Sequence, residues 1–338
     1  MSRILVCYIG AMFPPRARRS RRRFAVIGML AVAGCSGDAT APDVRLLDLT
    51  PAAGLAVGVG GTMRFNLQAF GPGGVAVAPD GALWSSNDPE VATVSQDGVA
   101  RAVAEGVTQV SVRLGEARAS ASLEVYIADR IVGDPEPGAS YFGREGYVEY
   151  IPGTLPVVLS APHGGRETPD EIANRSAGVR IRDTNTLELT LAVRDALVEL
   201  TGAAPHVVMS HLDRSKLDPN REEVEAAQGD PFAEQAWREY HAFIEEARSK
   251  VGDFGGGMYF DLHGHGHPKN RLELGYLIGA DVLDRPDRLL DALSVVQMTS
   301  IRELGRDAPI PFSALLRGPT SLGGLLEAEG VASVPSPA

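Results

Sequence analysis

The sequence is almost free of cysteine. Cys7 and Cys35 are the only two in 338 residues, so none follows position 35. A disulfide framework and a thiolate zinc site are therefore excluded from the rest of the chain. A metal bound there must use histidine and carboxylate ligands, a set that suits zinc with an open position for water.

The chain also lacks a hydrophobic run long enough to span a membrane near its basic start. Residues 24–33 are ten apolar or small residues, preceded by Arg21–Arg23 and followed by Gly34 and Cys35. As a helix they would rise only about 15 Å, half of the hydrocarbon core. A charged region, a short apolar region and small residues before a cleavage point predict a signal peptide over residues 1–35.

The end of this leader resembles the lipobox of bacterial lipoproteins. It reads Val-Ala-Gly-Cys at residues 32–35, and the resemblance implies that Cys35 is acylated and becomes the mature N-terminus. The alternative is an incidental thiol in an ordinary signal peptide. Residues 20–24 also resemble a twin-arginine export signal, and residues 1–11 are interpreted as excess before a start at Met12. Ser36 gives no inner-membrane retention signal, which favours the outer membrane.

Positive charge is scarce outside the leader. The chain has 43 Asp and Glu against 32 Lys and Arg. Seven of the arginines lie before residue 35, where no acidic residue occurs. Nucleic acid is therefore excluded as a partner, because binding phosphates needs a basic face. The expected membrane contact is the lipid anchor.

After a polar tether at residues 36–43, residues 44–127 predict short strands. Residues 107–112 and 119–125 alternate apolar and polar side chains, and Asp80-Gly81 and Asp97-Gly98 are typical of hairpin turns. Strands at this spacing indicate a small β-sandwich.

The same segment resembles bacterial Ig-like modules of group 2. The pattern is Ala-Leu-Trp-Ser-Ser-Asn-Asp-Pro at residues 82–89, followed by residues 91–94, 97–100 and 104–107. The resemblance implies that Trp84 is the core tryptophan. We expect a spacer or wall-binding role for this module, because it contains no catalytic constellation.

A linker or entry strand is predicted at residues 128–145, and residues 146–338 then predict an α/β domain, because strands alternate with helices. Buried strands are expected at Leu155–Ala161, Pro205–Ser210 and Gly257–Leu262. The first helix should run from Asn185 to Leu200 and end at Gly202, with one apolar face made of Leu189, Val193, Ala196, Leu197 and Leu200. The second should begin at Asp230-Pro231, with Phe232, Ala236, Tyr240, Ile244, Ala247 and Val251 on one face.

Each predicted strand runs into a segment that contains histidine. These segments begin at His163, His211 and His263, and the last also holds His265 and His267. Ligands bind beyond the carboxyl ends of strands in an open α/β sheet. A single histidine is more often structural, but three strand ends together favour a shared site.

Two carboxylates are candidates for the third metal ligand. Glu167 lies four residues after His163, and Asp183 lies at the start of the first predicted helix. Asp183 is preferred, although its other interpretation is helix capping, a role that Asn185 with Glu188 could also fill. A cationic loop at residues 214–221 favours binding of a substrate carboxylate, because a guanidinium matches a carboxylate bidentately.

Residues 140–338 together resemble the N-formylglutamate amidohydrolase family. The segments are LPVVLSAPHGG, RDTNTLEL, HLDRSKLDPNRE and DLHGHGHP, after an opening at residues 147–153. The resemblance implies a zinc-exopeptidase-like α/β fold and hydrolysis of an amide on an acidic amino acid. It also implies that His163, Asp183 and His263 bind the metal. The substrate carboxylate would be bound by Asn220 and Arg221, and we expect Arg214 and Lys216 of the same loop to contribute to this binding.

Two functions follow from different classes. The first is an envelope-anchored zinc amidohydrolase that acts on small acidic N-acyl amino acids or on peptides, including peptides from peptidoglycan. In this enzyme, His265 would shuttle protons or stabilise the oxyanion. The second is a non-catalytic wall-binding or scaffolding lipoprotein with a degenerate hydrolase fold. Related chains extend beyond the point that corresponds to residue 338 here, and the resemblance places a glutamate general base in that part. The resemblance therefore also implies slow turnover, because this base would be missing.

The leader gives the first testable expectation. Cys35→Ser should release the protein from membranes or block its processing, because the acylated thiol is the predicted anchor. Detergent extraction and the intact mass of the mature protein measure this. Unchanged membrane association and unchanged mass in the variant would show that the lipobox interpretation is wrong.

Overall fold

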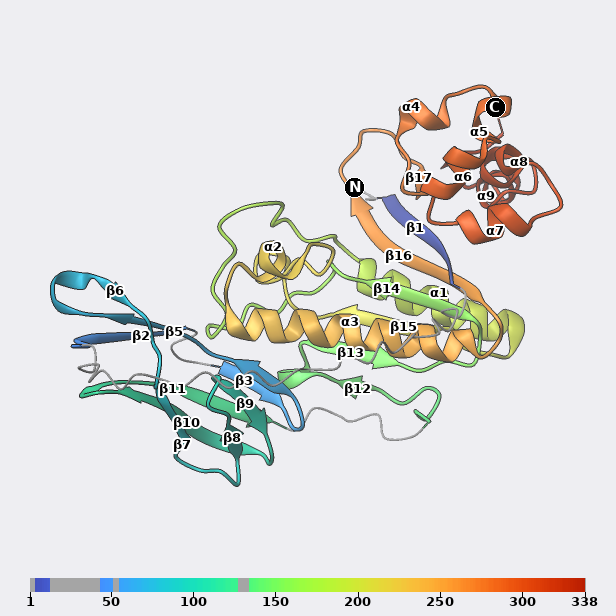
Figure 1. The fold of residues 1–338 in the computed structure, drawn as a ribbon. Coiled ribbons are helices and arrows are strands. Elements are labelled where there is room, and N and C mark those ends of the chain that lie inside the picture. The colour runs from blue at the N-terminus through green and yellow to red at the C-terminus, as the bar shows by residue number, and fades with distance from the viewer. Residues whose placement is uncertain (1–3, 13–42, 51–54, 127–133, 338) are drawn as a thin grey trace, which may run out of the picture. The chain divides into compact units, whose positions relative to one another are not determined.

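The computed structural model describes residues 4–12, 43–50, 55–126 and 134–337 (Figure 1). The chain divides into two units, residues 15–126 and residues 1–14 with 127–338. The first unit is built of β-strands and the second is a mixed α/β unit, so the predicted order of a β domain followed by an α/β domain agrees with the structure.

The first unit consists mainly of short strands. They form three sheets with the orders β3-β11-β10-β7, β2-β5-β6 and β4-β9-β8. The strands are β2 (Leu46–Thr50), β3 (Leu55–Gly58), β4 (Thr62–Arg64), β5 (Asn66–Phe70), β6 (Ala76–Val77), β7 (Leu83–Ser86), β8 (Ala92–Val94), β9 (Val99–Ala102), β10 (Gly106–Leu114) and β11 (Ala117–Tyr126), with a 3-10 turn η1 (Pro72–Gly74).

Trp84 lies in the core of this unit, as predicted. Its ring centroid is 6.3 Å from that of Phe65, within one cluster of buried side chains. Gly98 in the β8–β9 turn has a φ of 78°, and a Cβ there would lie 3.0 Å from the Trp84 ring. The predicted hairpin at Asp97-Gly98 is confirmed, whereas Asp80-Gly81 connects strands of different sheets, because β6 pairs with β5 and β7 with β10.

The second unit is built on a mixed eight-stranded sheet with the order β12-β13-β15-β14-β16-β1-β17-β18. Its strands are β1 (Ile4–Met12), β12 (Tyr141–Phe142), β13 (Val148–Ile151), β14 (Val157–Ala161), β15 (His206–Ser210), β16 (Gly257–His265), β17 (Leu272–Gly275) and β18 (Ser333–Val334). Strand β14 is parallel to both β15 and β16, so the carboxyl ends of these three strands meet at one edge. The three strands correspond to those predicted, but β16 extends to His265.

Helices cover both faces of the sheet around β14 and β15. Side chains of α3 (Pro231–Gly252) pack with Val158 and Val208, and those of α1 (Thr186–Thr201) pack with Leu159 and Val207. Neighbouring residues of a strand point to opposite faces, which explains why these strands are apolar throughout. The other helices are α2 (Glu223–Ala227), α4 (Ala280–Leu283), α5 (Asp287–Leu290), α6 (Leu293–Met298), α7 (Arg302–Asp307), α8 (Phe312–Arg317) and α9 (Leu322–Ala328), with a 3-10 turn η2 (Arg144–Gly146).

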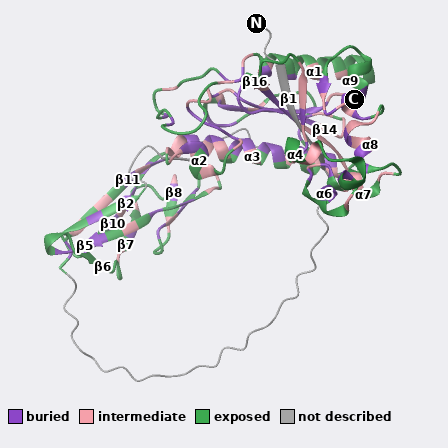
Figure 2. Ribbon diagram, turned by 90° about the horizontal axis from the view of Figure 1, so that it is seen from above, coloured by how far each residue is buried: buried purple, intermediate pink, exposed green. Residues whose placement is uncertain are grey.

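The two long helices differ in how well the sequence predicted them. Helix α3 begins as expected, because the Asp230 side chain accepts hydrogen bonds from the backbone N–H groups of Phe232 and Ala233. Helix α1 ends at Gly202 as expected, but Asn185 has a φ of 68° and makes no side-chain cap. Much of α1 is exposed (Figure 2), including Leu200 at 81%. The predicted apolar face of α1 is thus wrong in part, because the helix buries Thr186 and Thr190 instead.

Residues 128–145, predicted as a linker or entry strand, include a strand of the α/β unit. Strand β12 pairs with β13, and the buried side chain of Arg144 forms an ion pair of 2.5 Å with Glu171. The Arg144 guanidinium also lies 4.4 Å from the centre of the Phe232 ring. These contacts make the second half of the predicted linker part of the α/β unit.

The beginning of the chain differs from the sequence prediction. Ile4–Met12 form strand β1, which is antiparallel to β16 and parallel to β17 inside the sheet. The structure therefore places part of the predicted leader in the α/β unit. Cys35, the arginine-rich segment and residues 36–42 of the tether lie outside the described residues. None of the helices in the described residues combines the length and the hydrophobicity that a membrane span requires.

A buried acid on α3 gives a prediction about stability. Glu239 is 8% exposed, and burial raises its pKa from 4.5 to about 7 despite a hydrogen bond from the backbone N–H of Arg144. Because the folded pKa is raised, its contribution to stability is present below pH 4.5 and is lost as the pH rises toward 7. We expect Glu239→Gln to match the wild type near pH 4.5 and to exceed its unfolding free energy by about 1–3 kcal/mol at pH 8.

Urea unfolding at the two pH values measures this difference. Glu245→Gln is the control, because Glu245 lies on the same helix with an exposed side chain. The same pH dependence in both variants would contradict the prediction.

Candidate metal centre

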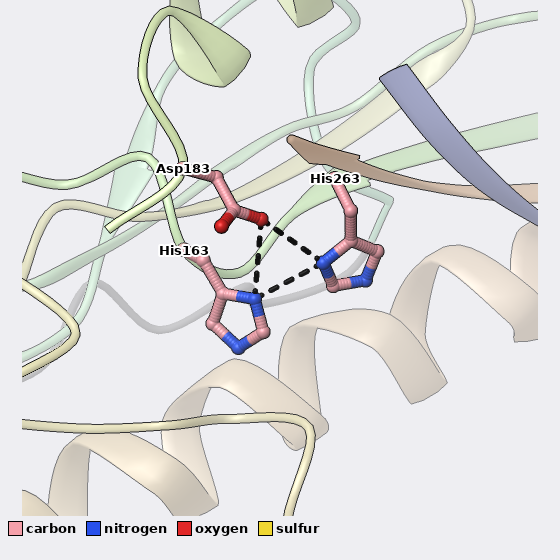
Figure 3. Close-up of side chains that lie close together, drawn as sticks. All are labelled: His163, Asp183 and His263. Atoms are coloured by element: carbon pink, nitrogen blue, oxygen red, sulfur yellow. Dashed lines mark hydrogen bonds and ion pairs between the residues drawn. The ribbon is translucent and has the colours of Figure 1, made fainter. Parts of the chain in front are cut away.

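Three side chains from separate segments meet at the carboxyl edge of the sheet (Figure 3). His163 follows β14, Asp183 precedes α1, and His263 lies within β16. The two Nδ1 atoms are 3.0 Å apart, and Asp183 Oδ2 lies 3.5 Å from His163 Nδ1 and 3.2 Å from His263 Nδ1. All three side chains are buried.

These separations suit a small divalent ion. Ligand atoms about 2.05 Å from a tetrahedral zinc lie about 3.3 Å from one another. The three measured distances of 3.0, 3.2 and 3.5 Å lie on both sides of that value. The trio can therefore take three corners of a tetrahedron without a large movement of any side chain.

The backbone holds the loops of this site close together. The N–H of Asp183 donates to the carbonyl of His163 at 2.8 Å, and the N–H of Gly264 donates to Asp183 Oδ2 at 3.0 Å. A Cβ on Gly165 would overlap the backbone of His211. Glycine is required there because the loop after β14 crosses the end of β15 in contact with it.

Each histidine of the trio has a carboxylate behind it. His163 Nε2 lies 2.6 Å from Asp218, and His263 Nε2 lies 2.9 Å from Asp261. With a metal bound, such a carboxylate would accept the Nε2 proton and leave the Nδ1 lone pair directed at the centre. The arrangement fixes the tautomer and the ring orientation that metal binding needs.

Cationic side chains offset the buried carboxylates. Arg214 lies 3.1 Å from Asp218 and 3.5 Å from Asp183, and Arg175 lies 3.7 Å from Asp218. Burial opposes ionisation of Asp183 and Asp218, but hydrogen bonds with His163 outweigh it and hold the pKa of both carboxyls well below the usual range. Both remain charged at neutral pH.

The pKa of His263 is raised, in contrast to those of Asp183 and Asp218. Burial lowers its pKa, but the neighbouring carboxylates of Asp261 and Asp183 outweigh this effect and raise it to about 9. Ser160 donates a hydrogen bond to Asp261, and Asn220 Nδ2 lies 2.5 Å from its other oxygen. The same network lowers the pKa of Asp261 against the effect of its burial.

An open cavity of about 520 Å³ lies beside this network. Asn220 and Asp261, which contact His263, form part of its wall. Arg221, Trp237 and His241 also line it, with the Trp237 and His241 ring centroids 4.1 Å apart. The volume is that of a small-molecule site, and the lining offers one guanidinium and an aromatic surface.

The structure separates the residues predicted for the cationic loop. Asn220 and Arg221 line the cavity, whereas Arg214 is held by Asp183 and Asp218 inside the cluster. Lys216 is buried and donates to the carbonyl of Ile172 at 2.6 Å, so it does not face a substrate. Its ammonium instead holds two loops together.

Other predicted residues also lie elsewhere. The exposed Glu167 uses its backbone to pair with His211 and Asp213, so Asp183 is the carboxylate beside the two histidines. The ring of His265 is occupied, with Nε2 3.1 Å from the carbonyl of Arg271 and Nδ1 accepting from the N–H of His267. These contacts leave no free ring nitrogen for the proton transfer that was expected.

Sequence reasoning missed the two carboxylates behind the histidines and the aromatic wall of the cavity. Asp261 and His263 stand two apart in a strand, so they share a face, and this spacing could have revealed the pair. Asp218 gave no comparable signal, because it lies in an irregular loop. Trp237 and His241, four apart on a helix, could have been identified as neighbours on one face.

Comparison with known proteins identifies the first unit. Residues 49–125 match the bacterial Ig-like domain (group 2), which suggests an extracellular or surface protein. No curated protein matches the chain.

Among solved structures, domains 4 and 5 of the S-layer protein SbsC are similar at 22% identity and a TM-score of 0.24. The match covers 26% of this chain and 54% of that one. Domains 5–6 of the same protein are similar at 17% identity over 32% of this chain and 60% of that one, with a TM-score of 0.24. This chain thus spans less than two thirds of either structure.

The raised pKa of His263 leads to a prediction for the metal-free protein. Its imidazole should remain protonated up to about pH 9, and Asp261→Asn should move the pKa toward the ordinary 6.5. The stability gained from this proton is complete below pH 6.5 and is lost as the pH rises through 9. Nitrogen-15 NMR of the histidine rings, recorded with chelator present, measures the titration.

Glu149→Gln serves as the control, because Glu149 forms its ion pair with His211, at 2.9 Å, and not with His263. A wild-type His263 that titrates near 6.5 would contradict the electrostatic account.

Proposed function

We propose that the α/β unit is a zinc-dependent amidohydrolase that cleaves an amide bond on an acidic amino acid or a wall-derived peptide. The observation that carries this proposal is the buried trio of His163, Asp183 and His263, in which each histidine has its own carboxylate partner. Two imidazoles and one carboxylate with an open fourth position are typical of catalytic zinc sites. The sequence resemblance to N-formylglutamate amidohydrolases supports the same reaction.

The residues of the site would divide the work as follows. Zinc held by the trio would supply Lewis-acid polarisation of the scissile carbonyl. With the metal bound, Asp218 and Asp261 would keep both Nδ1 lone pairs directed inward, and Arg214 would limit the negative charge around Asp183. These residues hold the centre rigid, so that little reorganisation accompanies the reaction.

Substrate selection belongs to the cavity. Arg221 is the one guanidinium in the lining of the cavity. Within the described residues, the one acidic group that pairs with its side chain is the exposed Glu225, at 3.2 Å. A substrate carboxylate can replace that surface partner and gain a bidentate contact. Trp237 offers an apolar surface beside it, which suits the carbon chain of an acyl amino acid or peptide.

The finer location is also part of the proposal. The Ig-like match supports a protein outside the cytoplasm, and Cys35 provides a lipid anchor, with the outer membrane as the favoured site. Cleavage before Cys35 would remove β1 from its place beside β16 and β17. The mass of the mature protein distinguishes a chain that keeps β1 from one that begins at Cys35.

Substitutions in the two parts of the site should have different effects. His163→Ala and His263→Ala should each lose about one zinc equivalent and nearly all turnover, because a catalytic zinc usually has three protein ligands. Arg221→Ala should retain the metal and raise KM, because it removes substrate binding. Elemental analysis and steady-state kinetics with N-acyl-glutamates and muropeptides measure both effects.

Glu167→Gln is the matched control, because Glu167 is an exposed carboxylate four residues from His163 and is not one of the trio. Full zinc content in both histidine variants would show that the ligand assignment is wrong.

A non-catalytic wall-binding or scaffolding role is the second candidate, and the Ig-like match favours it. Bound metal does not distinguish the two, because an inactive site can still hold zinc. Turnover that chelator abolishes and zinc restores supports the enzyme. Pull-down by insoluble peptidoglycan without any turnover supports the scaffold.

A further inference from the structure

A second group of potential metal ligands lies where β16 ends. One ligand atom each from His265, His267 and Glu273 lies within 4.8 Å of the others. His267 Nδ1 is 2.9 Å from Glu273 Oε2, and the ring centroids of the two histidines are 4.9 Å apart. None of these residues belongs to the buried trio.

Neighbouring contacts hold Glu273 beside His267 and fix His265 in the same loop. Arg271 binds Glu273 Oε1 through two nitrogens at 3.2 and 3.3 Å, which leaves Oε2 facing His267. His265 is fixed by the loop itself, through the carbonyl of Arg271 and the N–H of His267. The loop of residues 266–271 is therefore folded back so that both imidazoles lie beside the carboxylate.

We propose that His265, His267 and Glu273 form a second divalent-cation site, separate from the buried centre and independent of the proposed hydrolysis. Two imidazoles and a carboxylate suit zinc or a similar ion, with water in the remaining positions. The side chain of His267 is 63% exposed, whereas that of His163 is 1% exposed. The ion at the second site exchanges with solvent and is removed by chelator before the buried one.

The geometry also explains why this site is the weaker one. Its side chains are less buried than those of the trio, and both ring nitrogens of His265 already have partners in the loop. Binding therefore requires His265 to give up one of its loop contacts. Part of the binding free energy is spent on that rearrangement.

The second site connects two strands that do not pair directly. His265 ends β16 opposite Ile4 of β1, and Glu273 lies in β17 opposite Val6 of the same strand. An ion held by both residues ties β16 to β17 across β1 and closes the loop of residues 266–271. We therefore assign the site a structural role as a metal clip at this end of the sheet.

Equilibrium dialysis of the full chain against Zn²⁺, followed by elemental analysis, tests the proposal. The wild type should bind two equivalents, His267→Ala and Glu273→Gln one each, and His263→Ala one. The variant that carries both His263→Ala and His267→Ala should bind less than one tenth of the wild-type amount. His211→Ala is the matched control and should keep two, because in the described residues no third ligand completes the His211–Glu149 pair.

Hydrogen exchange of residues 266–271 gives a second measurement. Zinc should slow their exchange several-fold in the wild type and in His263→Ala, but not in His267→Ala. Zinc binding by His267→Ala equal to that of the wild type would overturn the second site. Loss of one equivalent in His267→Ala, with no loss in His263→Ala, would instead overturn the buried centre and leave the second site standing.

Discussion

The buried charge at the carboxyl ends of β14 and β16 is the constraint on which the α/β unit depends. Asp183, Asp218 and Asp261 lie there with two imidazoles, away from water. An uncompensated buried charge costs several kcal/mol, so the negative charges need matching cations. Arg214 and Arg175 supply two, and a proton on His263 supplies a third. A divalent ion among the trio can replace that proton, which links metal binding to the stability of the fold.

This charge balance explains how the surrounding loops are arranged. The loop that carries Arg214 and Asp218 must lie inside, against His163. Its Lys216 is therefore buried and donates a hydrogen bond to the carbonyl of Ile172 in another loop. The same loop then turns outward, and Asn220 and Arg221 reach the cavity wall. One continuous segment thus both stabilises the centre and faces the space where a substrate can bind.

The sequence was most informative where local patterns decide the structure. The three apolar strands, the start of α3 at Asp230 and the meeting of His163, Asp183 and His263 could be predicted, because strand ends and capping residues have short-range signatures. The contacts of Lys216 and His265 could not, because the direction of a loop side chain depends on distant partners such as Ile172. Strand β1 was missed for the same reason, since its pairing with β16 joins segments about 250 residues apart in the numbering. The predicted face of α1 was wrong in part, because the structure buries Thr186 and Thr190 and leaves Leu189 and Leu200 exposed.

X-ray absorption at the zinc edge of the purified, zinc-loaded protein tests the central claim most directly, with His267→Ala used to remove the exposed site. The account predicts one zinc with two imidazole nitrogens and one carboxylate oxygen in its first shell, at about 2.0–2.2 Å. A zinc surrounded by water oxygens alone, or a protein that holds no zinc, would contradict it.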